Sequence, residues 1–226
     1  MQLSKNDIQF QREQILKVHG RKKSRIRHSY RLLISVLGVK QPVEYDRSLN
    51  RAFYEAMSLL DYDYFGFNAP KLIWLRGNTL CMTRLSGYSL ESTDLNNNII
   101  SQLFSEMNER HFVASKNNAP RLIHLDSNFR NILISNDGIS RLDFEMGRPY
   151  EPIHDLCTRE ISKTFVSLLK SNESPDLSAS ISKFCDIYFD KPLLRKWALK
   201  VLNKHLQHGT PLELIATEFI RCLGEQ

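Results

Sequence analysis

The sequence lacks the features that would place the protein in a membrane or outside the cell. No window of its 226 residues approaches the roughly 18 consecutive apolar residues that a membrane-spanning helix needs. The N-terminal stretch MQLSKNDIQFQREQ contains no apolar segment of the kind that a secretory signal requires. We therefore expect a cytoplasmic protein.

Cysteine is scarce, and the cysteines are not arranged in pairs. The chain has four, widely spaced and without a C-x-x-C motif: Cys81, Cys157, Cys185 and Cys222. This spacing favours neither a zinc site nor a disulfide framework. We expect buried, reduced thiols, as is usual for proteins of the cytosol.

Acidic residues are nearly absent from one segment near the N-terminus. Between Arg12 and Arg31 the only acid is Glu13, and the net charge of the whole chain is +6. Such a segment attracts the phosphates of nucleic acid, anionic lipid or a phosphorylated glycan, and charge alone does not choose among them. The alternative is an ordinary solvated helix face. The segment contains few aromatic residues for base stacking, which argues against nucleic acid.

Hydrophobic residues make up 42% of the chain, enough for a packed core. Apolar periodicity predicts short strands at residues 8–10 and 14–18 and helices at about 21–37 and 46–60. In the second helix we expect Leu49, Phe53, Met57 and Leu60 to form the buried face. Two further strands, joined by a Gly-Asn turn, follow and end near Leu85.

The second part of the chain is predicted to be mostly helical. A helix of about four turns begins near residue 97, a hairpin follows, and residues from about 155 onward are almost entirely helical, with Pro192 and Pro211 at helix starts. We therefore expect an α+β protein with two lobes: residues 1–86, with strands and helices, and residues 87–226, mainly helical.

The stretch HLDSNFRNILISNDGISRLDFE, residues 124–145, carries polar side chains at both ends of the predicted hairpin. The pattern suits phosphoryl transfer. Asp126 would accept the proton of an attacking hydroxyl, and His124 would brace the loop. Asn131 and Asp143 would supply hard oxygen ligands to Mg²⁺.

This spacing resembles the protein-kinase-like superfamily, in which H-x-D-x₄-N precedes D-F-G or D-F-[DE]. Leu125 stands where Arg or Gly is usual, and Glu145 replaces Gly, as in small-molecule and sugar kinases. From about Ile8 to Lys170 the chain looks most like bacterial lipopolysaccharide core kinases that act on heptose or Kdo, which are related to small RIO-like and aminoglycoside-kinase-like proteins. The segments ILKV and GFNAPKLI carry that likeness.

The resemblance implies a bilobal protein-kinase-like fold that binds ATP and Mg²⁺. It implies that Lys17, on a strand, contacts the nucleotide phosphates and that Glu55, on the following helix, holds Lys17. The alternative is that Lys17 is an edge-strand surface residue and Glu55 a solvated helix residue. The backbone of Thr83, Arg84 and Leu85 would bind the base.

One departure from the family concerns glycine. No glycine precedes Gly20, and only sixteen residues precede Lys17, whereas these kinases fit a glycine-rich phosphate-covering loop there. The chain is therefore a pared-down kinase, a sequence that starts late, or a kinase-like binding module without turnover.

The resemblance also suggests an acceptor, namely a sugar hydroxyl of a lipopolysaccharide core or related surface glycan. A lipid-linked acceptor requires peripheral contact with the inner face of the cytoplasmic membrane, and the basic segment, with Ile26, Tyr30, Leu33 and Leu37 on one face, suits such a surface. That face could equally pack on the lobe. A looser likeness to the small kinase-like ATPase subunits of tRNA threonylcarbamoylation leaves open a protein-directed kinase or ATPase, and Asp155 is expected to cap the next helix or to support the loop.

Overall fold

The computed structural model describes residues 6–11, 13–19, 48–144, 146, 151–171, 176–204 and 210–224. The basic helix expected at residues 21–37 and the acidic Glu145 lie outside these residues. The chain divides into two compact units. Unit 1 comprises Met1–Ser86 with Asp143–Pro149, and unit 2 comprises Gly87–Leu142 with Tyr150–Gln226. The segment that begins at Asp143, expected in the second lobe, therefore groups with unit 1.

Unit 1 contains a four-stranded antiparallel sheet in the order β1-β2-β4-β3. Its strands are β1 (Asn6–Phe10), β2 (Gln14–His19), β3 (Leu72–Arg76) and β4 (Thr79–Thr83). The expected Gly-Asn turn joins β3 to β4, and Gly77 supplies the positive φ of 57° that the turn needs. The strands predicted from alternation and turn residues are confirmed.

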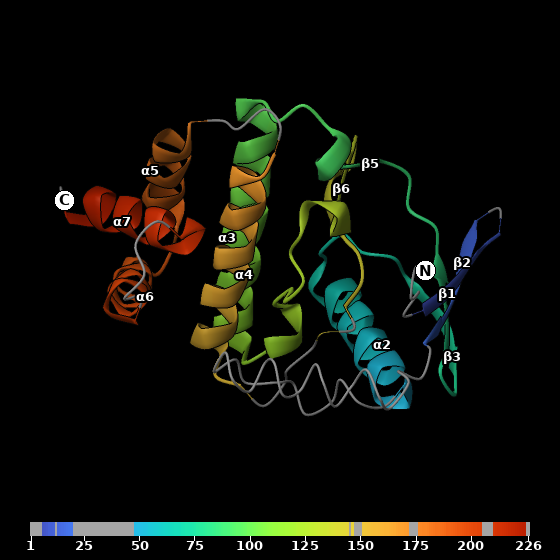
Figure 1. Cartoon of the computed structure of the whole chain (residues 1–226). Coiled ribbons are helices and arrows are strands. Elements are labelled where there is room, and N and C mark those ends of the chain that lie inside the picture. The colour runs from blue at the N-terminus through green and yellow to red at the C-terminus, as the bar shows by residue number, and fades with distance from the viewer. Residues whose placement is uncertain are drawn as a thin grey trace. The chain divides into compact units, whose positions relative to one another are not determined.

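Helix α2 (Ser48–Phe65) packs against this sheet (Figure 1). The expected apolar face of α2 is wrong, because Phe53 and Leu60 are 52% and 46% exposed. Its apolar core residues are instead Ala52, Ala56, Leu59 and Tyr62. The prediction failed because charged residues share the buried face with these apolar ones, so the buried face is not the most apolar one.

Unit 2 begins with short elements and one long helix. These are β5 (Tyr88–Ser89), the 3₁₀ turn η2 (Leu90–Ser92) and α3 (Asn97–Asn117). The side chain of Asn96 caps α3 by accepting from the N–H groups of Asn98 and Ile99, each at 3.0 Å. Two further 3₁₀ turns follow, η3 (Pro120–Leu122) and η4 (Phe129–Asn131).

The predicted hairpin is present in unit 2. Strands β6 (Ile132–Ser135) and β7 (Gly138–Arg141) pair antiparallel, and β5 extends them into a three-stranded sheet. The described residues of the unit continue with helices α4 (Ile153–Leu169), α5 (Leu177–Ile187), α6 (Lys191–Lys204) and α7 (Pro211–Gly224). The α+β class expected from the sequence is therefore confirmed, with an antiparallel sheet first and a mainly helical part after it.

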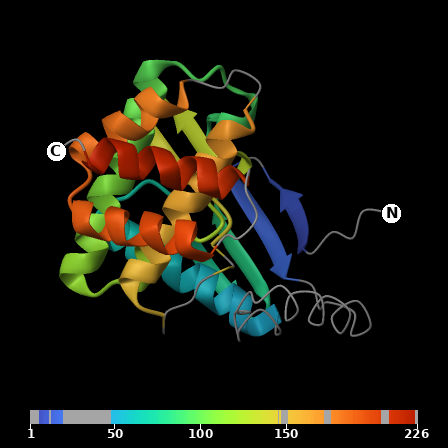
Figure 2. The ribbon, with the colours of Figure 1, turned by 60° about the vertical axis from the view of Figure 1, so that its left-hand side comes forward.

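Aromatic side chains hold the helices of unit 2 together. Phe165 of α4 packs on Phe104 of α3 and on Phe219 of α7, with ring centroids 5.3 Å apart in both pairs. Phe184 of α5 and Trp197 of α6 join the same cluster. Helices α6 and α7 lie side by side, as Figure 2 shows. This core fixes α4, the helix on which the candidate site of unit 2 depends.

The next two features are the apolar length of the helices and the state of the cysteines. Within the described ranges, no helix is long and apolar enough to cross a membrane. All four cysteines are free thiols, and all but Cys222 are buried.

Gly87 is required where the chain enters β5. Its φ is +138°, and a Cβ at this position would lie 2.7 Å from the carbonyl oxygen of Ile134 in β6. Neither the backbone conformation nor the space suits another residue. Gly66, after α2, also has a positive φ, +78°, but a Cβ there meets nothing within 4 Å.

We predict that Gly87→Ala lowers the free energy of unfolding by about 3 kcal/mol, because it adds a backbone clash to an unfavourable φ. Gly66→Ala carries the conformational cost alone and should lose only about 1 kcal/mol. Urea unfolding followed by circular dichroism measures both variants. Equal losses would show that the contact with Ile134 does not matter.

Candidate functional site

Lys17 forms a buried ion pair with Glu55 within unit 1. Lys17 lies in β2 and is 5% exposed, and its Nζ is 2.9 Å from Oε1 and 2.8 Å from Oε2 of Glu55. Glu55 is fully buried on the face of α2 that packs on the sheet. A buried ammonium requires such a partner. The contact that the sequence predicts between these two residues is therefore present, and the alternative of two solvated residues is wrong.

His19 belongs to the same cluster, although the sequence gave it no role. Alternate residues of a strand share a face, so His19 lies beside Lys17, and its Nε2 is 3.0 Å from Oε2 of Glu55. Burial alone would raise the pKa of Glu55, but the charge of Lys17 and the hydrogen bond from His19 outweigh it and lower the pKa. The period-two alternation of β2 was the signal that would have identified His19.

Asp143 completes the Lys17 cluster, which we define as Lys17, His19, Glu55 and Asp143. Its Oδ1 is 2.6 Å from Lys17 Nζ, and its side chain is about one-third exposed. The φ of Asp143 is +64°, in the left-handed region that non-glycine residues rarely adopt. The next residue, Phe144, is buried against Tyr62 of α2 with ring centroids 4.6 Å apart, which anchors the strained turn.

In unit 2, three side chains hold the carboxylate of Asp126. Its Oδ1 accepts from Asn128 Nδ2 at 2.7 Å and from Lys163 Nζ at 2.8 Å, and its Oδ2 accepts from Asn131 Nδ2 at 3.0 Å. Burial would raise the pKa of Asp126, but Lys163 outweighs that effect and lowers the pKa. Asp126 is therefore an ionised and oriented carboxylate. Lys163, on α4, was not identified from the sequence.

The orientation of Asn131 follows from its partners. Its Nδ2 donates to both the backbone oxygen and Oδ2 of Asp126, each at 3.0 Å, and both of these atoms can only accept. The amide oxygen of Asn131 is therefore turned away from Asp126, where it can serve as a hard ligand. Asp143 offers a partly exposed carboxylate.

The oxygens of Asn131 and Asp143 are the ligands that the sequence predicts for Mg²⁺. Among the described residues there is no group of three or more His, Cys, Asp or Glu side chains that could hold a metal ion. Mg²⁺ does not need such a group, because it keeps several waters and is held by one or two protein oxygens together with substrate phosphates. The amide oxygen of Asn131 in unit 2 and the carboxylate of Asp143 in unit 1 are each, by themselves, of the ligand type that Mg²⁺ takes, whereas structural zinc takes sulfur and nitrogen ligands.

His124 braces the loop and is not poised to react. Its Nε2 lies 2.7 Å from the carbonyl oxygen of Leu142, and that oxygen can only accept, so Nε2 carries the proton. Burial lowers the pKa of His124 to about 4, so the ring is neutral at physiological pH. The bond ties the loop to the residue that directly precedes Asp143 in the chain.

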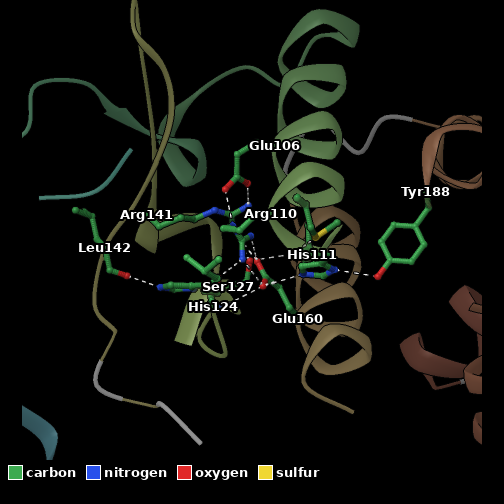
Figure 3. Close-up of polar contacts among 12 residues, drawn as sticks. Glu106, Arg110, His111, His124, Ser127, Arg141, Leu142, Glu160 and Tyr188 are labelled. Atoms are coloured by element: carbon green, nitrogen blue, oxygen red, sulfur yellow. Dashed lines mark hydrogen bonds and ion pairs between the residues drawn. The ribbon is translucent and has the colours of Figure 1, made fainter. Parts of the chain in front are cut away.

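Next to this loop lies a largely buried group of ionisable residues, the Glu160 network, which we define as Glu106, Arg110, His111, Arg141 and Glu160 (Figure 3). Glu160 Oε2 accepts from the backbone N–H of His124 at 2.8 Å and lies 3.1 Å from Nε2 of His111. Arg110 binds both oxygens of Glu160, at 2.9 Å and 2.5 Å. Burial would raise the pKa of Glu160, but its partners, Arg110 first, hold that pKa well below its usual range.

Arg141 and Ser127 connect the network to the loop. Arg141 Nη1 donates to Ser127 Oγ at 2.8 Å, while Nη2 lies 2.5 Å from Glu106 Oε2. Ser127 Oγ in turn is 2.9 Å from Thr164 Oγ1 of α4. The residues flanking Asp126 are therefore fixed from below by buried, paired charges.

Two minor expectations concern Asp155 and the segment Thr83–Leu85. Asp155 does not cap α4, because the N-cap is Pro152 and Asp155 lies exposed in the first turn; Glu160, not Asp155, supports the loop. In the segment expected to bind the base, the N–H groups of Thr83 and Arg84 donate to the carbonyl oxygens of Lys71 and Glu13. Two of its three N–H groups are thus engaged within unit 1, and base binding at Thr83–Leu85 stays a prediction.

Comparisons with known proteins place this geometry in context. No protein-family model and no curated protein sequence matches the chain. Among solved structures, the chain is similar to the Rio2 kinase–ADP/Mg²⁺–phosphoaspartate complex from Chaetomium thermophilum. The TM-score is 0.46 and the identity 15%, over 97% of this chain and 70% of that chain. A likeness of this degree assigns neither substrate nor activity.

We predict that Glu160→Gln strongly destabilises unit 2, by about 3–5 kcal/mol, because it leaves Arg110 and Arg141 buried without their main counter-charge. Glu109, exposed on α3, provides the matched control, and Glu109→Gln should change stability by less than about 0.5 kcal/mol. Chemical denaturation gives both values. A Glu160→Gln protein as stable as Glu109→Gln would show that the network does not stabilise the unit.

We further predict that acidification destabilises the protein through His124. Its pKa is about 4 when folded and its ordinary value is 6.5. Between these two pH values, His124 is protonated in the unfolded chain and neutral in the folded chain. The free energy of unfolding therefore falls by on the order of 3 kcal/mol as the pH drops from about 6.5 to about 4. In His124→Asn the same titration, followed by urea unfolding, should show a shallower slope over this range. An unchanged slope would exclude His124 as its source.

Proposed function

We propose that the protein is an ATP- and Mg²⁺-dependent phosphotransferase whose acceptor is an alcohol hydroxyl. The observation that carries this proposal is Asp126, an ionised carboxylate held by three side-chain donors, one of them Asn131, whose amide oxygen is turned away from Asp126. A fixed base next to a hard oxygen ligand is the arrangement that transfer to a hydroxyl needs.

Five residues then have one task each: Asp126, Lys17, Glu55, Asn131 and Asp143. Asp126 accepts the proton of the attacking hydroxyl. Lys17, held by Glu55, binds phosphate oxygens of the nucleotide, and Asn131 and Asp143 hold the cation that neutralises phosphate charge. The contact of 2.6 Å between Lys17 and Asp143 supports this assignment, because it pairs the phosphate-binding ammonium with the carboxylate proposed for the metal.

The finer proposal concerns the acceptor, which we take to be a sugar hydroxyl of a lipopolysaccharide core or related surface glycan. It is supported by the sequence resemblance in ILKV, around Lys17, and in GFNAPKLI, which leads into β3. A lipid-linked acceptor would bring the protein to the inner face of the cytoplasmic membrane. A protein acceptor is the competing outcome of the experiment below.

We predict that Asp126→Asn lowers phosphate transfer from [γ-³²P]ATP by at least about 100-fold, because the attacking hydroxyl loses its base. The assay offers a panel of purified lipopolysaccharide core glycans and proteins, with the chain itself included. Asp137→Asn, in the exposed hairpin turn, is the matched control and should transfer label like the unmodified protein.

The panel separates the possible results. Label on a glycan that disappears in Asp126→Asn supports the full proposal, and label on protein alone replaces the acceptor while keeping the mechanism. Label transfer that persists in both Asp126→Asn and Asp143→Asn would show that the proposed mechanism is wrong.

A specific observation favours a second candidate, a nucleotide-binding module without turnover. Strands β1 and β2 are joined by residues 11–13, none of which is glycine, and the backbone N–H of Gln11 donates to Gln14 at 2.9 Å across that turn. This connection is too short to cover phosphates with backbone N–H groups in the way that a glycine-rich loop does. A rise in melting temperature with ATP and Mg²⁺ but no transfer of label would establish this candidate.

A further inference from the structure

One face of helix α4 contacts three successive points of the loop that carries Asp126. Glu160, Lys163 and Thr164 occupy positions i, i+3 and i+4, which lie together on a helix surface. Glu160 binds the backbone N–H of His124, and Thr164 binds the side chain of Ser127. Lys163 contacts the carboxylate of Asp126 itself.

Lys163 differs from its two neighbours in its exposure. Glu160 and Thr164 are fully buried, as a purely structural role requires. The side chain of Lys163 is 40% exposed, whereas that of its partner Asp126 is 17% exposed. A solvated lysine adds little to stability as an ion pair, and its four-carbon stem lets the ammonium move. The contact of Lys163 with Asp126, the proposed base, is therefore not explained by packing or stability.

We propose that Lys163 is a second catalytic residue, which holds Asp126 before substrate binds and contacts the transferred phosphoryl group during the reaction. This inference rests on the proposed function and deepens it.

The contacts of Asp126 carry the argument. A carboxylate offers about four acceptor positions, and Asn128, Lys163 and Asn131 take three of them. An acceptor hydroxyl that occupies a remaining position lies about 2.7 Å from a carboxylate oxygen. The phosphorus that this hydroxyl attacks is then close to the carboxylate that Lys163 already contacts at 2.8 Å. The ammonium group of Lys163 is thus within reach of the equatorial oxygens of the phosphoryl group, where negative charge accumulates during the transfer.

The step is balanced without a further reactant. The hydroxyl oxygen forms a bond to the γ-phosphorus, the bond from that phosphorus to the β–γ bridging oxygen breaks, and ADP leaves with the electron pair. The hydroxyl proton passes to Asp126. Lys163 keeps its protons throughout and supplies charge alone.

The test uses Mg·ATP as the probe, with water as the acceptor and phosphate release as the signal. We expect Lys163→Met to lower kcat by about 100-fold, as the loss of one donor to a transition-state anion does, and to leave KM for ATP within about threefold. Lys163→Arg keeps the charge and should recover most of the activity. Lys170→Met, at the exposed end of the same helix, is the matched control and should behave like the unmodified protein.

A double-mutant cycle separates contact with phosphate from simple positioning of the base. In an Asp126→Asn background, a lysine that acts only through the carboxylate has nothing left to position, so Lys163→Met would cost nothing more. We expect a further loss of at least about tenfold in that background. Absence of this loss would overturn the phosphate contact, and so would a Lys163→Met protein as active as Lys170→Met.

The same experiment distinguishes failure of this inference from failure of the proposed function. If the unmodified protein binds Mg·ATP but releases no phosphate and labels no acceptor, the phosphotransferase proposal and the role of Lys163 fall together. If it turns over while Lys163→Met is unaffected, only the role of Lys163 falls. Melting temperatures of Lys163→Met and of Lys163→Gln show that each variant is folded, since a half-exposed helix position tolerates both residues.

Discussion

The arrangement of unit 2 depends on one buried carboxylate. Glu160 has no exposed surface, and its charge is tolerated only because Arg110, His111 and a backbone N–H of the loop surround it. An unpaired charge in that position would cost several kcal/mol, so the partners must be present together. The consequence is geometric. Helix α3 supplies Arg110 and α4 supplies Glu160, so the backbone N–H of His124 at the start of the loop must lie within hydrogen-bond distance of Glu160.

The two clusters solve the problem of buried charge in the same way. In unit 1, Glu55 is fully buried and is neutralised by Lys17 and His19 from one face of β2. In unit 2, Glu160 is fully buried and is paired with Arg110 and His111, whereas Asp126 and Lys163 are partly exposed to solvent. In each unit the fully buried carboxylate lies deep, and a partly exposed one lies nearer the surface. The exposed carboxylates are open to solvent, while the buried ones fix the geometry.

Sequence spacing identified the candidate site residues, and it missed the residues that support them. Asp126, Asn131 and Asp143 were identified by fixed intervals in one short stretch, and Lys17 and Glu55 by the resemblance to kinases. The sequence did not identify Lys163 and Glu160, because they lie some 35 residues after the loop, in a helix whose sequence pattern shows only an apolar face. The buried face of α2 was misassigned for a related reason, since it includes two charged residues, Arg51 and the Glu55 that pairs with Lys17. Periodicity detects apolar burial, and it is blind to charges that are buried in pairs.

The single face of α4 that contacts the loop also couples the loop to the rest of the helical unit. A residue inserted between Glu160 and Lys163 would rotate one contact by about 100° relative to the other, so the spacing of these side chains cannot drift while the loop keeps its shape. Because Phe165, one position beyond Thr164, is packed into the aromatic core with Phe104 and Phe219, any tilt of α4 caused by repacking that core is transmitted to Asp126. The packing of the apolar core of unit 2 therefore helps to set the position of Asp126.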